Sequence, residues 1–319
     1  MLFRSVLVNT QPASKGKYLL QFQALYSRSL VMQAIRQYFA TQGFLEVETP
    51  FLIPANAPEE YIDPVPALPW QLQTSPEICM KRLLCRGHDK IFQICRCWRA
   101  DERGSRHLSE FTMLEWYRTN ADYRDLMQDC LGLLQHVADC CTADACFNRN
   151  ARKIDPHQTW QHFSVQEAFL RFSKADALTS MQNGLFDLLL TDQIEPALEK
   201  FEVPVILKDY PAQLAALARI KTDAPDFAER FELYVGGLEL ANGFSELTEP
   251  VEQRVRFNEA NRIRLRMGKP ELPLPEPFLA ELSAMPPSAG IALGVDRLVM
   301  LTIGADSIDQ VVAFTPESL

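Results

Sequence analysis

Residues 95–117 read CRCWRADERGSRHLSEFTMLEWY, and this stretch decides the fold. The segments 90–99 and 111–117 predict two strands, which the polar, glycine-containing segment 100–110 joins. A basic loop between antiparallel strands can hold a bent triphosphate, because an arginine can clamp a phosphate and an aromatic ring can stack on a base. A charged hairpin that faces solvent is the alternative interpretation.

A second segment, residues 231–247, predicts a hairpin that turns at Gly236-Gly237. This turn lets Glu232 and Glu239 meet across the hairpin. Two facing carboxylates repel unless a cation lies between them, and oxygen ligands favour Mg²⁺ beside phosphates. Glu246 follows in an apolar run, where a buried carboxylate needs a partner such as a substrate ammonium. A solvent-facing strand edge is the alternative.

The third segment, GIALGVDR at residues 290–297, predicts a strand that runs into a helix over 296–303. Its glycines allow a backbone to approach a ligand closely, and Arg297 lies at the helix start, where a phosphate is also favoured. An ordinary strand-to-helix turn would have the same pattern, so this segment carries weight only together with the other two.

Strand hairpins separated by groups of helices predict an α+β fold with an antiparallel sheet flanked by helices. The remaining expectations are helices over 23–42, 80–84, 121–141, 164–201 and 251–267, strands over 43–50 and 203–207, and surface loops over 52–70 and 270–277. We expect one domain over 1–319, with residues 1–23 as an N-terminal extension.

The composition bears on nucleic-acid binding, on the compartment of the protein and on the state of its cysteines. The chain has 319 residues, 47% of them hydrophobic, and a net charge of -9, which argues against a large nucleic-acid surface. We expect a cytoplasmic protein, because the N-terminus lacks the features of a signal peptide and no apolar run would span a membrane. The eight cysteines lack zinc-knuckle spacing and are interpreted as reduced thiols.

Three segments, taken in their order along the chain, resemble the signature motifs of class II aminoacyl-tRNA synthetases. Residues 43–50 resemble the first motif, which builds a dimer interface, residues 99–111 the second, and residues 294–297 the third. The strings RHLSEFTMLEWY (106–117) and ELANGFSEL (239–247) resemble the lysyl branch. The resemblance covers nearly the whole chain from about residue 24 and implies a class II catalytic core.

Only about forty residues precede Gly43, which leaves too little chain for an anticodon-binding domain. This shape, with TSPE at 74–77, MKRLL at 80–84 and Ala292 where lysyl-tRNA synthetases usually have glycine, resembles the truncated paralogues that modify elongation factor P. The resemblance implies a homodimeric, ATP-dependent ligase that activates (R)-β-lysine or lysine and transfers it to a lysine of elongation factor P. Charging of tRNA and a non-catalytic regulator that binds lysine or ATP remain the alternatives.

The same resemblance implies the roles of individual residues. Arg99, Arg297 and Glu239 would be catalytic, and Glu232 with Glu239 would carry Mg²⁺. The implied ATP-binding set is Arg99, Ala100, Asp101, Glu102, His107, Leu108, Phe111, Glu239, Leu240, Gly294 and Arg297. The implied substrate-binding set is Ser75, Pro76, Glu77, Glu115, Tyr117, Asn242, Phe244, Glu246 and Ala292.

Within the ATP set, Arg99 would hold the α-phosphate, while His107 and Arg297 would hold the γ-phosphate. Phe111 would stack on adenine, and Asp101 or Glu102 would accept from its amino group. The chain also departs from the family at Ala100-Asp101, where the family has Asn-Glu, and at Leu108, where it has Asn. Leucine cannot donate an amide hydrogen bond, so we expect the nucleotide to be held somewhat differently here. The loop 52–70 is shorter than in relatives, which we expect to alter acceptor docking.

Overall fold

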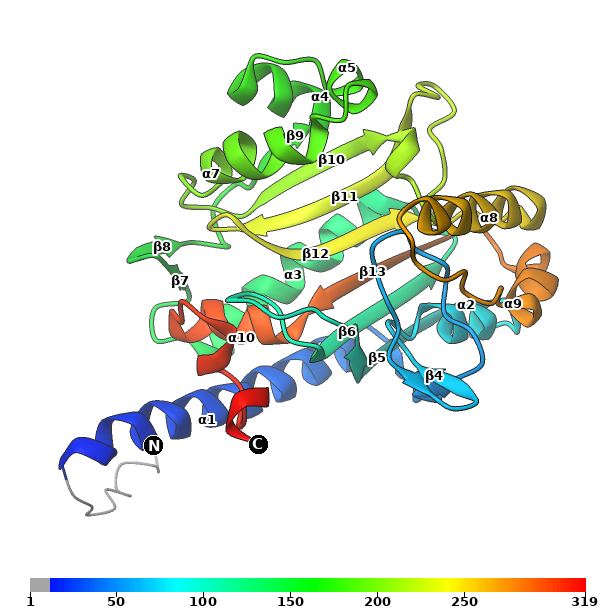
Figure 1. Ribbon diagram of the computed structural model, residues 1–319. Coiled ribbons are helices and arrows are strands. Elements are labelled where there is room, and N and C mark those ends of the chain that lie inside the picture. The colour runs from blue at the N-terminus through cyan, green and yellow to red at the C-terminus, as the bar shows by residue number, and fades with distance from the viewer. Residues whose placement is uncertain (1–11) are drawn as a thin grey trace.

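A computed structural model describes residues 12–319, with side chains described from residue 22. Its centre is an eight-stranded sheet with the strand order β1-β5-β6-β13-β12-β11-β10-β9 (Figure 1). The bounds of these strands are β1 Leu45–Glu46, β5 Lys90–Trp98, β6 Glu110–Thr119, β9 Gln161–Ser164, β10 Val205–Pro211, β11 Phe227–Val235, β12 Leu238–Ser245 and β13 Ser288–Gly294. The three predicted signature segments thus supply the adjacent strands β5, β6, β13, β12 and β11.

The prediction of an antiparallel sheet is correct for the centre and wrong at both edges. β1 pairs with β5 in parallel, and β9 pairs with β10 in parallel. In both cases a long connection that contains helices separates the paired strands, and a crossover of this kind is what parallel neighbours need. The sheet is therefore mixed.

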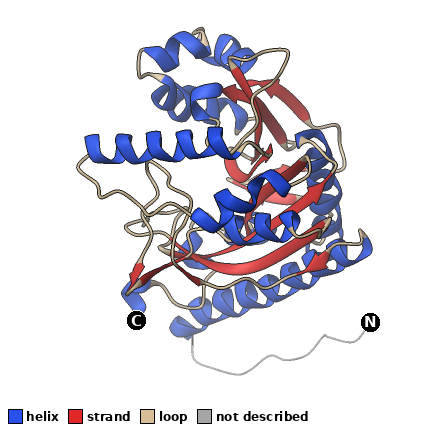
Figure 2. Cartoon of the chain, turned by 90° about the vertical axis from the view of Figure 1, so that its right-hand side faces the viewer, coloured by secondary structure: helices blue, strands red, loops and turns tan. Residues whose placement is uncertain are grey.

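Helices cover both faces of the sheet (Figure 2). Successive strand residues point to opposite faces, and β6 shows this clearly: Trp116 packs in one core with α1, α3 and α10, whereas Tyr117 packs in another with α2, α8 and α9. The helix bounds are α1 Pro12–Thr41, α2 Glu77–Cys85, α3 Tyr123–Cys141, α4 Val165–Ala168, α5 Ala177–Gln182, α6 Phe186–Leu189, α7 Glu195–Leu198, α8 Pro250–Arg266, α9 Glu276–Glu281 and α10 Val295–Ile303. The Tyr117 face is the one that the site uses.

Helix α1 is longer than expected. It begins at Pro12 rather than near residue 23, so residues 12–23 belong to a helix and are not a separate extension. Residues 15–23, KGKYLLQFQ, are mostly good helix formers, which lets the helix continue toward the N-terminus. Residues 1–11, the rest of the predicted extension, lie outside the described part of the chain.

The segment 52–70 is a surface loop only in part, with Tyr61 and Leu68 exposed. It contains β2 Leu52–Ile53, β3 Pro66–Ala67 and the first residue of β4 Trp70–Leu72, which together form a small antiparallel sheet. Arg264 of α8, which is almost fully buried, donates to the carbonyl oxygens of Glu59 and Ile62 and to the carboxylate of Asp63. Prolines and acidic residues suggested exposure, but this buried arginine fixes the segment against α8.

The predicted hairpin at Gly236-Gly237 is confirmed. Both glycines have positive φ angles, 58° and 72°, which suit a tight two-residue turn. A bulge between Leu233 and Tyr234 shifts the register, so that Tyr234 lies opposite Glu239 and Glu232 lies opposite Asn242.

The other expected helices and strands occur close to their predicted positions.

All eight cysteines are free thiols, and Cys95 and Cys97 lie on one face of β5 with their sulfurs 3.9 Å apart. Among the helices of the described residues, none is long and apolar enough to cross a membrane.

Candidate functional site

Two adjoining cavities lie on the face of the sheet that carries Tyr117. The first, here called the nucleotide cavity, is formed by the loop between β5 and β6, by β12 and β13, and by the start of α10. Its lining includes these members of the predicted ATP set: Arg99, Glu102, His107, Leu108, Phe111, Glu239, Leu240, Gly294 and Arg297. Glu59, Ile62, Arg106, Met113, Ala241 and Ile308 also line it. The structure thus brings together residues from three distant segments.

Arg297 and His107 are in direct contact although 190 residues separate them. An Arg297 guanidinium nitrogen lies 2.7 Å from the His107 Nε2 atom, which acts as the acceptor. Burial, and then the positive charge of Arg297, lowers the pKa of His107, so the imidazole is neutral near pH 7. Arg297 also donates to the backbone carbonyl of Glu239 at 2.7 Å. These contacts fix the guanidinium at the wall of the nucleotide cavity.

Arg99 lies at the base of the loop between β5 and β6, with its guanidinium 5.1 Å from the centre of the Phe111 ring. Its Nε atom is buried and has no hydrogen-bond partner among the described residues. A buried, unpaired donor beside a cavity suits an anionic ligand such as a phosphate. Phe111 is half-buried, and Arg99 lies against its ring.

Two members of the predicted ATP set do not line the nucleotide cavity. Asp101 is exposed in a turn with a φ of 61°, and the amide of Ala100 donates to the Asp63 carbonyl at 2.7 Å. Glu102 does line the cavity and lies 3.8 Å from Arg99. Of the two acids proposed to accept from adenine, the geometry therefore favours Glu102. Leu108 lines the cavity with a buried apolar side chain.

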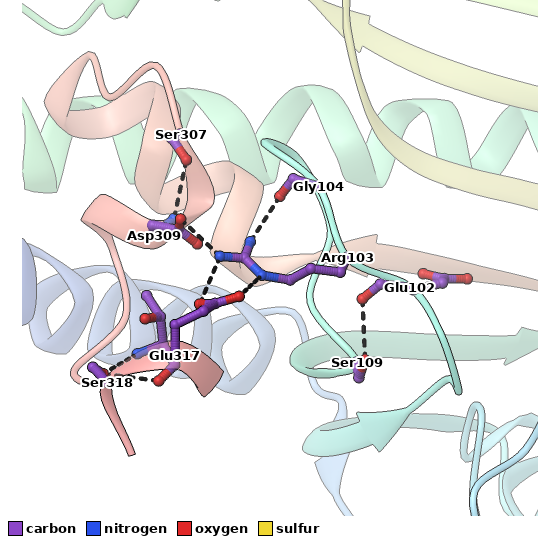
Figure 3. Close-up of polar contacts among 9 residues, drawn as sticks. Glu102, Arg103, Gly104, Ser109, Ser307, Asp309, Glu317 and Ser318 are labelled. Carbon is purple, nitrogen blue, oxygen red and sulfur yellow. Dashed lines mark hydrogen bonds and ion pairs between the residues drawn. The ribbon is translucent and has the colours of Figure 1, made fainter.

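The C-terminal segment anchors this loop (Figure 3). Arg103 donates to both carboxylate oxygens of Glu317, at 2.8 and 2.9 Å, and to Asp309 at 3.0 Å. The Ser109 hydroxyl donates to the Glu102 carbonyl within the loop. The arginine bonds lower the pKa of Glu317 to about 2. Residues near the end of the chain thus help to hold the loop that carries Glu102 and His107.

Glu232 and Glu239 differ in their surroundings. The Glu232 carboxylate accepts from the hydroxyls of Tyr210 and Tyr234, at 2.6 and 2.7 Å, and from Arg230 at 2.6 Å. The side chain of Glu239 is 39% exposed and lies at the nucleotide cavity. Burial, and then the charge of Glu239, raises the pKa of Glu232, although the two glutamates are not directly opposite each other in the hairpin.

A third acid, Glu195, extends this negative region. Its pKa is raised to about 7, first by burial and then by Glu239. The described residues contain no group of three or more acidic, histidine or cysteine ligands arranged to hold a metal ion by themselves. A Mg²⁺ ion here would need oxygens from phosphate or water in addition to the protein carboxylates.

The second cavity, here called the amino-acid cavity, adjoins the first. Arg99, Met113, Asn242, Ala292 and Glu59 line both. Its other lining residues are Ser75, Glu77, Glu115, Tyr117, Ala215, Ala216, Leu217, Arg230, Phe244, Gly290 and Ile291. Most of the predicted substrate set is therefore gathered here; Pro76 is the N-cap of α2 and lies outside this lining.

Glu115 organises the polar side of the amino-acid cavity. Its carboxylate accepts from the Ser75 hydroxyl at 2.6 Å and from the Tyr117 hydroxyl at 2.7 Å. The Ser75 oxygen in turn accepts from the Glu77 amide at 3.0 Å. Gly290 is required behind this network, because a Cβ atom there would lie 2.1 Å from the Tyr117 ring and 2.5 Å from a Glu246 oxygen.

From the sequence, a substrate ammonium was expected to pair with the Glu246 carboxylate. The structure shows instead that the ammonium of Lys81 is its partner. The Lys81 Nζ atom lies 2.5 Å from the carboxylates of both Glu246 and Glu77. Burial lowers the pKa of Lys81, but the two carboxylates outweigh it, so the net shift is upward and the ammonium stays charged. Burial raises the pKa of Glu246 to about 8 even with Lys81 in place. Glu246 lies beneath the amino-acid cavity and reaches it through Lys81 and Glu77.

Four residues that the sequence analysis did not select contribute to the two cavities. They are Glu59, Lys81, Arg230 and Asp296. Asp296 accepts from Arg28 of α1 at 2.6 Å and from the Thr112 amide at 2.7 Å, and so ties α1, β6 and α10 together. The sequence did contain a sign of this role for Lys81, because it lies among the apolar residues Ile78, Met80 and Leu84. A charge on an apolar helix face needs a buried partner.

Comparison with known proteins agrees with this geometry. The family described as tRNA synthetases class II (D, K and N) matches residues 20–318. A Salmonella gallinarum protein named "Elongation factor P--(R)-beta-lysine ligase" is 41% identical over 308 residues, which cover 91% of this chain and 94% of that protein. Proteins of the same name from Salmonella paratyphi B and Salmonella heidelberg are 40% identical, with the same coverage. The chain belongs to the class II tRNA synthetase family of the D, K and N group.

Proposed function

We propose that the chain activates (R)-β-lysine or lysine as an aminoacyl adenylate with ATP, and transfers it to a lysine side chain of elongation factor P. One observation carries this proposal: a nucleotide cavity that contains Arg99 and Arg297 and an amino-acid cavity that contains Glu77 and Glu115 share a wall, and Arg99 lines both. A diammonium amino acid held by the carboxylates would present its own carboxylate toward the ATP phosphates. The names of the relatives support both the amino acid and the acceptor.

In the first step, a substrate carboxylate oxygen attacks the α-phosphorus of ATP and pyrophosphate leaves. No protein nucleophile is needed, so the chain contributes positioning and charge stabilisation. Arg99 would stabilise the α-phosphate, and the paired Arg297 and His107 would hold the γ-phosphate. The second step is attack by the acceptor amine on the adenylate carbonyl.

Mg²⁺ fits the acidic hairpin. Burial first, and then the charge of Glu239, raises the pKa values of Glu232 and Glu195, which is consistent with a cluster of carboxylates around Glu239. Glu239, and Glu232 behind it, would hold the ion together with phosphate oxygens, as is usual for Mg²⁺ in nucleotide sites. The ion would neutralise charge on the phosphates and on the departing pyrophosphate.

The proposal includes a homodimer, and a protein rather than tRNA as the acceptor. Phe22, Leu25 and Tyr26 on α1, together with Leu45 on β1, expose apolar surface in the region that resembles the dimer-forming first motif. The net charge of -9 argues against broad contact with a nucleic-acid backbone.

Amino-acid-dependent ATP–pyrophosphate exchange tests the activation step. We expect exchange with (R)-β-lysine, and weaker exchange with L-lysine, at saturating ATP and Mg²⁺. The absence of exchange with either amino acid would refute the enzymatic function and favour a regulator that binds lysine or ATP.

Ala292 is expected to determine which isomer is preferred. It lines both cavities and lies opposite Glu115 and Asn242 in the sheet, so its methyl group takes space beside the amino-acid head. In Ala292→Gly we expect activity with L-lysine to rise about tenfold relative to (R)-β-lysine, since a methyl-sized change in a pocket has effects of this order. Exchange rates with both isomers measure the ratio, and an unchanged ratio would remove Ala292 as a determinant.

Amino-acid binding should weaken at acidic pH. Burial raises the pKa of Glu115 to about 7, so the carboxyl is mostly protonated at pH 6 and mostly ionised at pH 8. An ammonium binds the ionised form, so the apparent KM for the amino acid should be about tenfold higher at pH 6 than at pH 8. Exchange kinetics across this range measure it. In Glu115→Gln the KM should be high and nearly independent of pH; an equally steep profile in this variant would assign the titration to another group.

A further inference from the structure

A third cavity, here called the acceptor groove, opens beside the other two. It lies between residues 58–62, residues 212–217 and α8, with a volume of about 480 Å³. This volume falls within the range of sites that hold small molecules or single side chains. Among the residues that the structure describes, Glu59 alone lines the nucleotide cavity, the amino-acid cavity and the acceptor groove. The three spaces therefore meet at its side chain.

The backbone of Glu59 is fixed, whereas its carboxylate is not engaged. Arg264 donates to the Glu59 carbonyl at 3.0 Å and to the Ile62 carbonyl at 3.1 Å, and its other end binds Asp63 at 2.7 Å. Among the described side chains, none makes a hydrogen bond or salt bridge to the Glu59 carboxylate. Burial raises its pKa to about 7, although Arg99 opposes the shift.

The walls of the acceptor groove are complementary to a lysine side chain. Leu214, Leu217 and Phe257 provide apolar surface, and the carboxylate of Glu60 lies along the same groove, whereas that of Glu259 is paired with Arg262 and Arg266. Its one cationic residue, Arg256, is occupied by the carbonyls of Ala216 and Ala218 and by Glu252. A lysine places its methylenes on apolar surface and its ammonium among carboxylates, which is the arrangement this groove offers.

We propose that the acceptor lysine of the protein substrate enters through this groove, and that Glu59 is the general base that takes a proton from its ammonium. This inference rests on the proposed function and adds a catalytic residue for the second step. The groove, rather than the nucleotide or amino-acid cavity, is the open route once an adenylate fills those two spaces.

The Glu59 carboxylate takes one proton from the lysine ammonium and leaves a neutral amine with a lone pair. The amine nitrogen attacks the adenylate carbonyl carbon, the new C–N bond forms, and the bond from that carbon to the AMP oxygen breaks with its electron pair on AMP. The nitrogen loses its second proton to solvent as the amide forms, and Glu59 later releases its own proton to solvent.

Glu59→Gln separates the two half-reactions. We expect the ratio of single-turnover transfer, from the enzyme-bound adenylate to elongation factor P, to ATP–pyrophosphate exchange to fall about 100-fold, the usual order for loss of a general base. The parent transfer rate should rise with pH up to about 7, where Glu59 becomes ionised, and this limb should vanish in the variant. Hydroxylamine is already neutral near pH 7, so its reaction with the adenylate should be the same in both proteins.

Matched carboxylate variants serve as controls. Glu60→Gln, on the acceptor groove only, should raise the KM for elongation factor P without lowering the single-turnover rate at saturation. Glu271→Gln, which removes an exposed carboxylate from the connection between α8 and α9, should change neither half-reaction.

Three outcomes would overturn the assignment. Transfer by Glu59→Gln within about threefold of the parent would exclude a general base. An equal loss of exchange and transfer, with a higher KM for the amino acid, would make Glu59 a substrate-binding residue instead. Failure of the parent itself to exchange would refute the proposed function, and this inference with it.

Discussion

Arg99→Ala should lower amino-acid-dependent ATP–pyrophosphate exchange by about 1000-fold, the order of loss when an arginine that stabilises a transferring phosphoryl group is removed. The buried, unpaired Nε atom of Arg99 and its place on the wall between the two cavities are the reasons for this expectation. The charge that develops on the α-phosphate during attack would lose its nearest cation. The loss should fall mainly on kcat, because the contact would strengthen in the transition state.

Arg96→Ala is the matched control for this variant. Arg96 lies three residues earlier, at the end of β5, with a side chain that is 45% exposed and 3.7 Å from Glu110. Its removal should leave exchange nearly unchanged. If Arg99→Ala retained exchange within about tenfold of the parent, phosphate stabilisation by this residue would be excluded.

The second large effect is on stability. Lys81→Met should lower the free energy of unfolding by about 3–5 kcal/mol at pH 8, because it leaves the buried carboxylates of Glu246 and Glu77 without their shared cation. The pKa of Glu246 is about 8 with Lys81 in place and rises further without that cation, so the loss should grow as the pH rises above 8, where the parent gains an ionised pair and the variant does not. Denaturant unfolding at pH 8 and pH 9.5 measures both quantities.

A double variant distinguishes the charge effect from lost packing. Lys81→Met with Glu246→Gln should recover part of the stability, since one unpaired charge is removed together with the cation. Lys153→Met, which removes an exposed ion pair with Asp144, should change stability little. A loss in Lys81→Met that is the same at both pH values would contradict the ion-pair explanation.

The sheet and most of its loops could be predicted from the sequence because their signals are local. The Gly236-Gly237 turn, the strands on either side of the 100–110 loop and the strand-to-helix junction near Gly294 all depend on residues close in sequence. The proximity of His107 and Arg297 agrees with the family resemblance, which implied that both side chains hold the γ-phosphate. The parallel edges of the sheet were missed because they depend on which strands become neighbours after long connections.

The site residues that were not predicted have roles that arise only when distant segments are buried against each other. Lys81 and Glu246 form a pair only because α2 packs over the end of β12, and a substrate ammonium was the partner that the sequence suggested instead. Glu59 was assigned to a surface loop, since the buried Arg264 that holds its backbone lies more than 200 residues later. Composition indicated exposure for this segment, which is correct for Tyr61 and Leu68, but Arg264 holds the backbone at Glu59 and Ile62 against α8.

The most direct test of the central claim is transfer of labelled (R)-β-lysine to purified elongation factor P in the presence of ATP and Mg²⁺. We expect label on a single lysine of elongation factor P, detected as a mass increase of one β-lysyl group, no label when that lysine is replaced by arginine, and no label on bulk tRNA. Stable label on tRNA, with none on elongation factor P, would contradict the proposed acceptor.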